Sequence, residues 1–490
     1  MNSFSIQACR LPPRPVYSVV VTLAEIRSRL RAGQLSPVEL TRHVIRQYEQ
    51  HNPTLNAFIL TYFDEALAAA AESERRLRQG LGRSLEGLPL TIKDSLDVAG
   101  SPTTCGSLLY ARSKAAQDAT STRRLREAGA IIIGKTSCPE FLMNYETDNR
   151  LIGPTRNPWN LERTAGGSSG GESAAIAAGM SMGGIGSDGG GSIRWPAHAC
   201  GIAGLKPTPG RVSAAGHVPP IAHPGGLLGV AGPMARTAAD VKLLFSVLAH
   251  HDPGDPFSVP ISQRWPDLSE FFAQGHRIGL LNNWHGTPVQ ASIGAAVDKA
   301  AARLGQIGFV VEPFEPRGLE RAEPLWWFFF TQLGARAFLK TVESKRDQLH
   351  WSGLELFEQA LAEPEPDIPQ LLQNFAVRDK MRTSLLDQME THRVLLLPAA
   401  GVTAFPHRSR RWPTTAGEIG LRQAMETLTP FNLFGMPGLV IPFGMDEAGL
   451  PCGIQLVGRP YDEELLLEIA VSLEEARGPF PAPSVFRGVD

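Results

Sequence analysis

The stretch GGSSGGESAAIAAGMSMGGIGSDGGGS, residues 166–192, is the most informative part of this chain. Glycine has no Cβ, so it adopts left-handed backbone conformations easily and lets main-chain N–H groups surround an anion. Gly189, Gly190 and Gly191 come directly before Ser192. Backbone N–H groups around a serine hydroxyl are typical of an oxyanion hole. We therefore expect Ser192 to be a nucleophile and these three glycines to form its oxyanion hole.

A serine hydroxyl attacks only when a base takes its proton, and the sequence offers Lys93 for this role. Lys93 ends an apolar run with β character within GLPLTIKD, residues 87–94. Burial lowers the pKa of a lysine and leaves a neutral amine that can accept a proton. The alternative is a solvated lysine beside Asp94. The histidines are less promising bases, because His43 lies in a helix pattern and His407 adjoins an arginine.

Further motifs follow one another over most of the chain, and with them the sequence resembles the amidase signature family. An ordered set of this kind is far more specific than any one short motif. The motifs are GLPLTIKD (87–94), TTCGS (103–107), GKTSCPEF (134–141), TRNPWN (155–160), GGSSGGESAA (166–175), GSDGGGSIRWPA (186–197), GLKPTPGRVS (204–213), GPMARTAADV (232–241) and GIQLVGRPYDEELLL (453–467).

The resemblance implies a Ser–Ser–Lys triad. Ser192 would be the nucleophile, Ser168 a bridging serine on a cis peptide after Gly167, and Lys93 the base. A cis bond before a residue other than proline costs about 3 to 4 kcal/mol, so it persists only where the surrounding structure enforces it. Ser168 would accept the Ser192 proton while giving its own to Lys93.

Other residues are expected around this triad. Ser169, Asp188 and Arg194 would brace the loop, with substrate binding by the two charged groups as the alternative. The segment PLWWFFF, residues 324–330, is unusual in a chain that is 7% aromatic. It would form part of an apolar substrate channel or, alternatively, of the core. The expected substrate pocket comprises Thr104, Gly106, Met143, Asn144, Trp195, Trp326 and Trp327.

Three competing motif matches are rejected. Residues 129–136 have Walker A spacing, but their β-branched middle predicts a buried strand. Residues 184–189 have the dinucleotide-binding spacing, but glycines and Pro196 predict that no helix follows. Residues 166–170 fit a hydrolase nucleophile elbow, which needs a strand upstream, and residues 160–165 show no strand pattern.

Length and composition fit a large α/β enzyme. The chain has 490 residues and is 43% hydrophobic, with no linker, charge block or repeat that would mark a boundary. We expect one amidase-signature domain over 1–490, built on a large, mixed, twisted β-sheet sandwiched between α-helices. Residues 1–80 would be mainly helical, 85–250 would form the catalytic core, and 310–390 would be a variable substrate-channel region.

Several elements can be placed in advance. Thr22 and Ser36 are expected to cap two helices, the second ending near Asn52-Pro53. Alternation of apolar runs and helix patterns further along predicts the layers of the fold. Strands are expected at 88–92, 130–133 and 394–397, and a helix at 120–127.

Composition also argues against several classes of function. A net charge of −2 disfavours a nucleic-acid-binding surface, and the basic cluster at residues 408–411 would be a solvated loop. No run approaches the length of a membrane span. The five cysteines lack C-x-x-C pairing, so reduced thiols are expected and no zinc site. We expect a cytoplasmic enzyme without metal or organic cofactor, and a homodimer remains open.

The predicted function is a serine amidase that cleaves a carboxylic amide through an acyl-enzyme. Bulky aryl or apolar amides are the expected substrates, with carbamates and esters as further candidates. One alternative is the glutamine-hydrolysing component of a tRNA-dependent amidotransferase, which would need partner subunits. In those relatives an acidic residue precedes the Pro-x-Asn that is Pro430-Phe-Asn432 here, whereas this chain has Met425 there, with Glu426 adjacent. A catalytically silent scaffold is the non-enzyme alternative.

Overall fold

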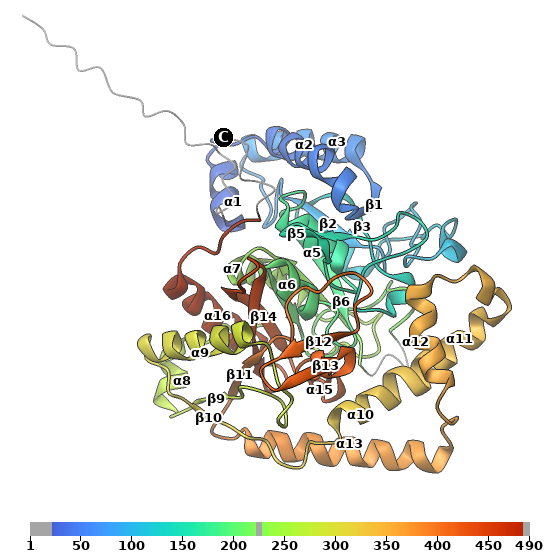
Figure 1. Ribbon diagram of the computed structural model, residues 1–490. Coiled ribbons are helices and arrows are strands. Elements are labelled where there is room, and N and C mark those ends of the chain that lie inside the picture. Colours follow the sequence, from blue (N-terminus) through green and yellow to red (C-terminus); the bar gives the residue numbers. More distant parts are fainter. Residues whose placement is uncertain (1–21, 222–227, 484–490) are drawn as a thin grey trace, which may run out of the picture.

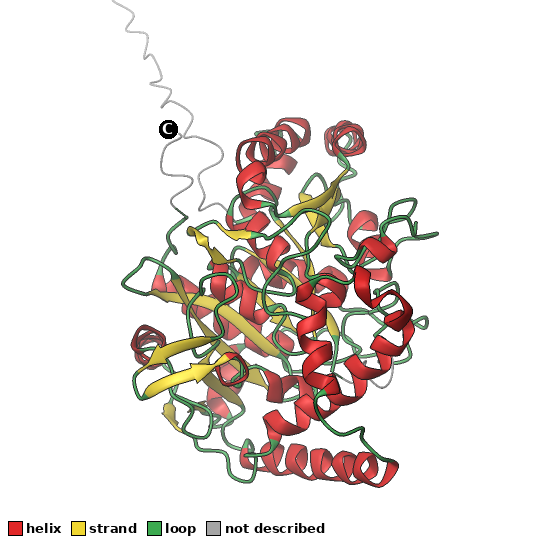
Figure 2. Ribbon diagram, turned by 45° about the vertical axis from the view of Figure 1, so that its right-hand side comes forward, coloured by secondary structure: helices red, strands yellow, loops and turns green. Residues whose placement is uncertain are grey.

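A large mixed β-sheet runs through the molecule (Figures 1 and 2). The computed structural model describes residues 22–221 and 228–483. Among these residues the sheet has eleven strands. In spatial order they are β1 (Phe58–Thr61), β3 (Ile131–Thr136), β2 (Pro89–Lys93), β6 (Gly183–Asp188), β8 (Val230–Ala235), β7 (Ala203–Lys206), β14 (Gly438–Met445), β15 (Pro451–Gly458), β11 (Val394–Pro398), β9 (Ile278–Leu280) and β10 (Val311–Pro313).

Neighbouring strands pair in both directions. β2 lies between β3 and β6 and is parallel to both. β6 pairs with β8 in the antiparallel direction, and β14 with β15 likewise. β2, β3, β6 and β11 are buried along their whole length. This burial explains why β2, β3 and β11 are mainly apolar runs without strict alternation, whereas β6 (GGIGSD) is buried but rich in glycine. The strands predicted at 88–92, 130–133 and 394–397 are confirmed, with bounds shifted by a few residues.

Helices cover both faces of the sheet. In β3, Ile131 and Ile133 point into one hydrophobic cluster and Ile132 into another. Successive side chains of a strand face opposite sides, so these clusters are the two layers of the core. The first layer packs against α2 (Pro37–Leu55), α3 (Phe63–Arg78), α5 (Gly170–Ala177) and α6 (Arg194–Cys200). The second packs against α1 (Leu23–Arg31), α4 (Thr120–Glu127), α7 (Ala238–Leu248), α8 (Leu268–Ala273), α9 (Ala291–Gln306) and α16 (Glu463–Arg477).

The predicted caps are present. Thr22 Oγ1 accepts the N–H of Glu25 at 3.2 Å, and Ser36 Oγ accepts the N–H groups of residues 38 and 39. α2 continues beyond the expected end at Asn52-Pro53, because the Asn52 main chain and side chain accept the N–H groups of residues 56–58 and complete the last turn. The helix predicted at 120–127 is confirmed as α4.

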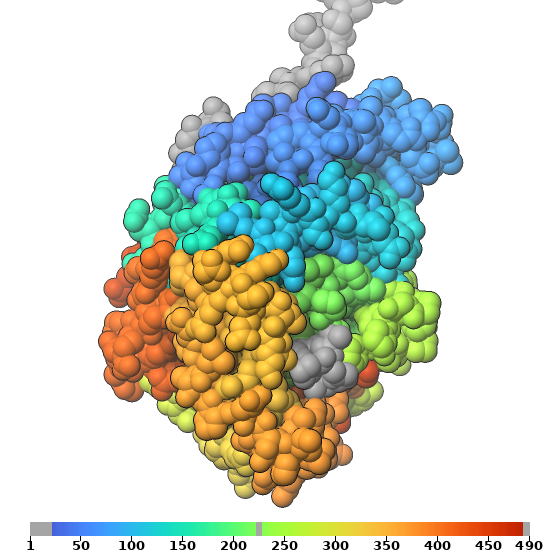
Figure 3. Space-filling model, turned by 90° about the vertical axis from the view of Figure 1, so that its right-hand side faces the viewer, coloured from blue at the N-terminus to red at the C-terminus, as the bar shows by residue number. Residues whose placement is uncertain are grey.

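Residues 322–388 form a helical layer on one side of the molecule, which we call the cap (yellow to orange in Figure 3). It consists of α10 (Ala322–Trp327), the π-helical η4 (Phe328–Ala335), α11 (Arg336–Val342), η5 (Glu343–Gln348), α12 (Trp351–Leu361) and α13 (Ile368–Gln388). The remaining elements are η1 (Leu108–Tyr110), η2 (Glu140–Leu142), α14 (Leu421–Ala424), α15 (Thr429–Leu433) and the small sheets β4 (Arg156–Asn157) with β5 (Asn160–Thr164) and β12 (Arg411–Thr414) with β13 (Gly417–Gly420).

Two local predictions were wrong. β5 is a strand, although its polar sequence NLERT shows no apolar alternation, because it pairs outside the main sheet with the two-residue β4 and, through a bridge at Arg163, with Pro406. α6 opens soon after β6 despite Pro196, which lies in the first turn, where a missing N–H costs no helical hydrogen bond. Residues 131–136 form the buried strand β3, as predicted.

Four cysteines, Cys105, Cys138, Cys200 and Cys452, are free and buried, while Cys9 lies outside the described residues. In residues 22–221 and 228–483, no helix has the length and apolar character needed to cross a membrane.

Candidate active site

Lys93 is the last residue of β2, and its side chain is fully buried. Its Nζ lies 2.7 Å from Ser168 Oγ, 3.0 Å from Ser187 Oγ and 3.3 Å from the Ser187 carbonyl oxygen. Burial lowers the pKa of the Lys93 ammonium to about 8, although the carboxylates of Asp188 and Glu172 work in the opposite direction. Near neutral pH this lysine is therefore close to the point at which it loses its proton.

Ser168 follows a cis peptide bond from Gly167, directly before α5. The next residue, Ser169, donates its N–H to the Ser192 carbonyl at 3.1 Å, and its hydroxyl donates to the Ser187 carbonyl at 3.3 Å. These two bonds hold the segment that carries Ser168 against the segment that carries Ser192. The lysine, both serines of the expected triad and their supporting residue thus lie in one place.

Close backbone packing explains the glycines of this region. A Cβ added at Gly167 would lie 2.7 Å from the Asn144 carbonyl oxygen, and one at Gly171 would lie 2.4 Å from the Ser137 nitrogen. No larger residue fits at such distances without moving the neighbouring main chain. The glycine-rich composition therefore reflects the contact of several chain segments at one point.

Asp188 and Arg194 form a buried ion pair that braces the loop before α6. Both side chains have no exposed surface, and Arg194 Nε lies 3.1 Å from Asp188 Oδ2. Burial alone would raise the pKa of the Asp188 carboxyl. The Arg194 charge instead holds this pKa well below its usual range. Arg194 also donates to Asn432 Oδ1 at 2.5 Å and to Gln455 Oε1 at 2.7 Å. These contacts are all within the protein, so the pair fixes the loop.

The backbone at Gly189–Ser192 is oriented by side chains from both sides. The Gly189 carbonyl accepts Trp326 Nε1–H at 2.8 Å, and the Gly190 carbonyl accepts the Tyr145 hydroxyl at 2.8 Å. The Gly191 N–H donates to Asp188 Oδ1 at 2.7 Å. This N–H is therefore already used, which reduces the expected oxyanion-hole donors to those of Gly189 and Gly190.

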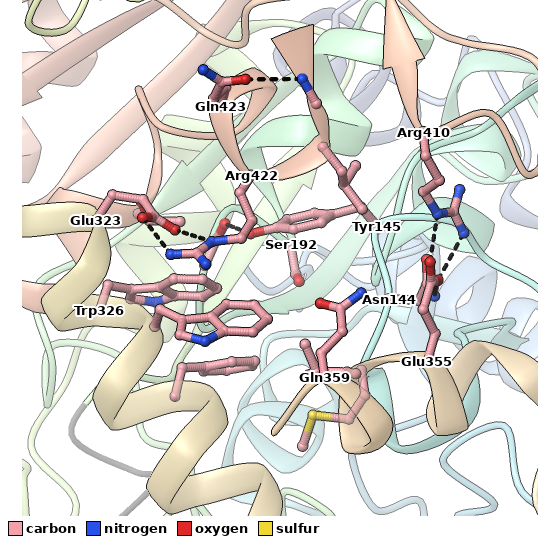
Figure 4. A pocket seen from close by; sticks show the side chains of 18 of the residues that line it. Asn144, Tyr145, Ser192, Glu323, Trp326, Glu355, Gln359, Arg410, Arg422 and Gln423 are labelled. Carbon is pink, nitrogen blue, oxygen red and sulfur yellow. Dashed lines mark hydrogen bonds and ion pairs between the residues drawn. The ribbon is translucent and has the colours of Figure 1, made fainter. Parts of the chain in front are cut away.

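Two chambers meet at Ser192, which is half-buried. The first has a volume of about 350 Å³. It is lined by Leu142, Met143, Asn144, Tyr145, Gly190, Ser192, Glu323, Trp326, Trp327, Phe330, Glu355, Leu356, Gln359, Arg410, Gly420, Leu421, Arg422, Gln423 and Thr429. The cap and residues 410–423 supply most of its wall, and Figure 4 shows Ser192 between them.

The second chamber has a volume of about 530 Å³ and is more uniformly apolar. It shares Leu142, Met143, Ser192 and Phe330 with the first chamber. Ser168 and Ser187 line only the second chamber. Its other lining residues are Tyr110, Phe141, Asp188, Gly189, His217, Val218, Pro219, Pro220, Ile221, Gly229, Gly334, Ala337, Phe338 and Thr341.

Two ion pairs lie on opposite walls of the first chamber (Figure 4). Arg422 binds Glu323 at 2.7 Å and lies over the Trp327 ring, 4.3 Å from its centroid. Arg410 binds Glu355 at 2.6 Å and also pairs with the buried Glu146. The prediction that 408–411 is a solvated loop was therefore wrong at Arg410, because Arg410 is ion-paired with Glu146 and Glu355. The sequence did not reveal these pairs, since both acidic residues are distant from Arg410 in the chain.

Four of the expected pocket residues line the first chamber: Met143, Asn144, Trp326 and Trp327. The other three lie outside both chambers. Thr104 donates its hydroxyl to Asp94, which is ion-paired with Lys135 at 2.8 Å behind β2. Gly106 packs against the Cys138 carbonyl, and Trp195 is fully buried and stacked on Phe405 at 5.3 Å. These three residues are therefore buried parts of the fold and not part of the pocket wall.

The structure adds residues that the sequence did not indicate. Phe330 lines both chambers and stacks on Trp326 at 4.9 Å, whereas Phe328 and Phe329 are buried in the core. Tyr145 follows Met143-Asn144 directly, so the adjoining motif could have pointed to it. Within the described part of the chain, no group of three or more His, Cys, Asp or Glu side chains is placed to hold a metal ion.

Known proteins of one family are similar to this chain over most of its length. The family model described as Amidase matches residues 39–467. The chain belongs to the amidase signature family. It is 35% identical over 474 residues to the A subunit of the glutamyl-tRNA(Gln) amidotransferase of Chloroflexus aurantiacus, covering 92% of this chain and 95% of that protein.

Solved structures of the family are also similar. A bacterial aryl acylamidase has a TM-score of 0.83 and 27% identity, with 96% of this chain and 99% of that chain covered. A 6-aminohexanoate cyclic dimer hydrolase complexed with its substrate has a TM-score of 0.82 and 28% identity, with 96% and 100% covered. As an amidase signature enzyme, the protein is a hydrolase of amide C–N bonds.

Proposed function

We propose that the protein is a serine amidase in which Ser192 attacks the amide carbonyl, Ser168 relays the proton and Lys93 is the base. The observation that carries this proposal is the 2.7 Å contact between Lys93 Nζ and Ser168 Oγ inside a fully buried site that opens to Ser192. A neutral lysine has two N–H bonds and one lone pair. The two N–H groups match the Ser187 oxygen atoms, which leaves the lone pair for the Ser168 hydroxyl.

The reaction follows from this arrangement. As Ser192 Oγ forms a bond to the carbonyl carbon, its proton passes to Ser168 and the Ser168 proton passes to Lys93. The oxyanion would receive hydrogen bonds from the N–H groups of Gly189 and Gly190. When the C–N bond breaks, Ser168 returns a proton to the amine nitrogen and regains one from Lys93. Water then releases the acid from the acyl-enzyme by the same relay.

The position of Ser168 supports an assignment of the acyl and amine portions of the substrate to the two chambers. The group that protonates the leaving amine must lie on the same side of the carbonyl as the amine. Ser168 lines only the second chamber, so the amine portion would occupy the second chamber and the acyl portion the first. Trp326, Trp327 and Phe330 would then contact the acyl group, and burial of apolar surface contributes about 25 cal/mol per Å². We infer a preference for amides, anilides or related carbamates and esters with a bulky apolar acyl group.

A panel of anilides that differ only in the acyl group tests this proposal. Acetyl, benzoyl and octanoyl anilides should be hydrolysed with kcat/KM rising as the acyl group grows. Equal efficiency on all three would contradict the assignment of the first chamber, and no hydrolysis of any amide by the folded protein would contradict the amidase proposal.

A second candidate function is glutamine hydrolysis as part of an amidotransferase, which the 35% identity to the amidotransferase relative supports. The residues around the acyl chamber favour it less. Met425 is buried in an apolar cluster, and Glu426 accepts a hydrogen bond from Thr287 at 2.5 Å. Glu323 and Glu355 do line the chamber, but each is paired with an arginine. Release of ammonia from glutamine by the isolated chain, at a rate above that on the anilides, would favour this second function.

A further inference from the structure

His217 belongs to the wall of the second chamber, beside Val218, Pro219 and the triad serine Ser168. It is 6% exposed, and the main chain around it is anchored, because the Val218 N–H donates to the Ser95 carbonyl at 2.7 Å. No step of the proposed reaction uses this imidazole. A polar ring therefore lies in an otherwise apolar part of the chamber without an assigned role.

The hydrogen bonding of His217 determines which nitrogen carries the proton. Nδ1 lies 2.7 Å from the Pro219 carbonyl oxygen. A carbonyl oxygen can only accept, so Nδ1 is the donor, and in a neutral imidazole Nε2 is then a bare acceptor. Burial lowers the pKa of His217 to about 4, and the nearby Lys93 acts in the same direction, so the ring is neutral at physiological pH.

Nε2 is shielded from solvent and has no hydrogen-bond partner among the described residues. A buried acceptor without a donor costs free energy, and a bound molecule that supplies the donor recovers it. We propose that Nε2 of His217 accepts a hydrogen bond from a hydroxyl group on the amine portion of the substrate, which makes His217 a specificity-determining residue for amides of hydroxyl-bearing amines.

This proposal rests on the proposed function, because the assignment of the second chamber to the amine follows from the role of Ser168. It makes a prediction about chemical class. An aminophenol-type amine is preferred over the same amine with a methoxy group, since methoxy keeps an electron-donating oxygen at the same position but has no hydrogen to donate. Sites that hydrogen-bond a substrate hydroxyl discriminate strongly against analogues that lack it.

The test compares kcat/KM for hydroxyanilides and methoxyanilides, at the ortho, meta and para positions, with one acyl group throughout. The variants are His217→Asn, His217→Gln and His217→Phe. Asparagine keeps a donor near the Pro219 carbonyl but has no acceptor at the Nε2 position, whereas glutamine can place its carbonyl oxygen there. The hydroxy-to-methoxy ratio within each variant does not depend on the fraction of protein that folds.

We expect a ratio of about ten or more in the unmodified protein at one ring position or more. It should fall to about one in His217→Asn and His217→Phe and be partly retained in His217→Gln. A ratio near one at every position, or a high ratio that survives His217→Asn and His217→Phe, would overturn the proposal while leaving the amidase function intact.

Absence of any anilide hydrolysis would instead count against the proposed function. In that case calorimetric binding of free aminophenols and the matched methoxyanilines decides the role of His217. The proposal is supported if the aminophenol binds about tenfold more tightly than the matched methoxyaniline at one ring position or more, and if this difference is lost in His217→Asn. Equal binding of the two compounds at every ring position would refute the proposal.

Discussion

The part of the molecule that carries Lys93, Ser168 and Ser192, which we call the core, meets the cap at Ser192, but the two regions differ in the side chains that form them. In the core, Lys93, Asp188 and Arg194 are fully buried polar groups, each held by several hydrogen bonds, and glycines bring backbone segments together. In the cap, aromatic rings, together with acidic side chains that pair with Arg410 and Arg422 outside the cap, form the wall of a chamber. In the proposed function the core would determine the chemistry, and most of the cap would determine which substrates are bound.

The two regions are coupled at one point. The Trp326 ring packs so closely on Gly190 that a Cβ there would lie 2.3 Å from Cζ2, and its Nε1–H holds the Gly189 carbonyl. Trp327 lies next to it but binds Glu363 within the cap at 2.7 Å. We therefore expect Trp326 to influence both chemistry and selectivity, and Trp327 to influence selectivity alone.

The largest effect is expected at the core nucleophile. Ser192→Ala removes the attacking atom, and loss of a residue from a triad that acts as a unit costs on the order of a millionfold in kcat. The melting temperature should stay close to that of the unmodified protein. Steady-state hydrolysis of an anilide measures the first quantity and calorimetry the second. Substantial activity in the folded variant would show that another residue attacks.

Lys93→Ala should lower kcat/KM by about 10²- to 10⁴-fold, the usual contribution of a positioned base. The pH dependence gives the sharper readout. Only the neutral amine accepts a proton, and the pKa of Lys93 is lowered to about 8, so kcat/KM of the unmodified enzyme should rise with pH and level off above about 8. Lys93→Ala should lose this rise.

Lys242→Ala is the matched control, because Lys242 is a partly exposed lysine on α7 paired with Glu468 at 2.6 Å. Its pH profile should match that of the unmodified enzyme. A rise near pH 8 that persists in Lys93→Ala would assign the base to another group.

Asp188→Asn tests the buried ion pair of the core. It leaves the Arg194 guanidinium buried without a counter-charge, which typically costs about 3–5 kcal/mol in the free energy of unfolding. Urea denaturation measures this. The control is Glu127→Gln, which breaks the exposed pair with Arg123 at the surface of α4 and should cause no measurable loss. Equal stability of the two variants would mean that the core pair does not brace the fold.

The smallest effects are expected in the cap. Trp327→Ala should lower kcat/KM for a benzoyl or octanoyl anilide by roughly tenfold to a hundredfold, equivalent to about 1.5–3 kcal/mol of lost apolar burial, with less change for the acetyl anilide. Trp326→Ala should lower both, and Trp326→Phe should show the loss of the Nε1–H while an aromatic ring is kept. Unchanged selectivity in both alanine variants would show that the two rings have a purely structural role.

The core was predictable because its chemistry and its backbone geometry both leave marks in the sequence. Closely packed backbone requires glycine, and a lone lysine at the end of an apolar strand is a candidate for burial, so residues 166–192 and the position of Lys93 could be picked out, while the role of Lys93 as the base stays a prediction. The strands at β2, β3 and β11 were likewise visible as apolar runs.

The cap was much less predictable. Trp195 and Trp326 are both tryptophans in informative segments, yet one is core and the other lines a chamber, and only tertiary packing separates them. The pairs Glu323–Arg422 and Glu355–Arg410 join residues far apart in the chain, which no local pattern reveals. β5 was missed for a related reason, since its strand conformation depends on pairing with β4.

The most direct test of the central claim is the site of covalent modification by a fluorophosphonate, which reacts with activated serine hydroxyls. Intact-mass analysis followed by peptide mapping should find one adduct per chain, on Ser192, and the adduct should be absent in Ser192→Ala and form much more slowly in Lys93→Ala. An adduct on Ser168, Ser169 or Ser187 instead, or undiminished labelling of Ser192→Ala, would contradict the account.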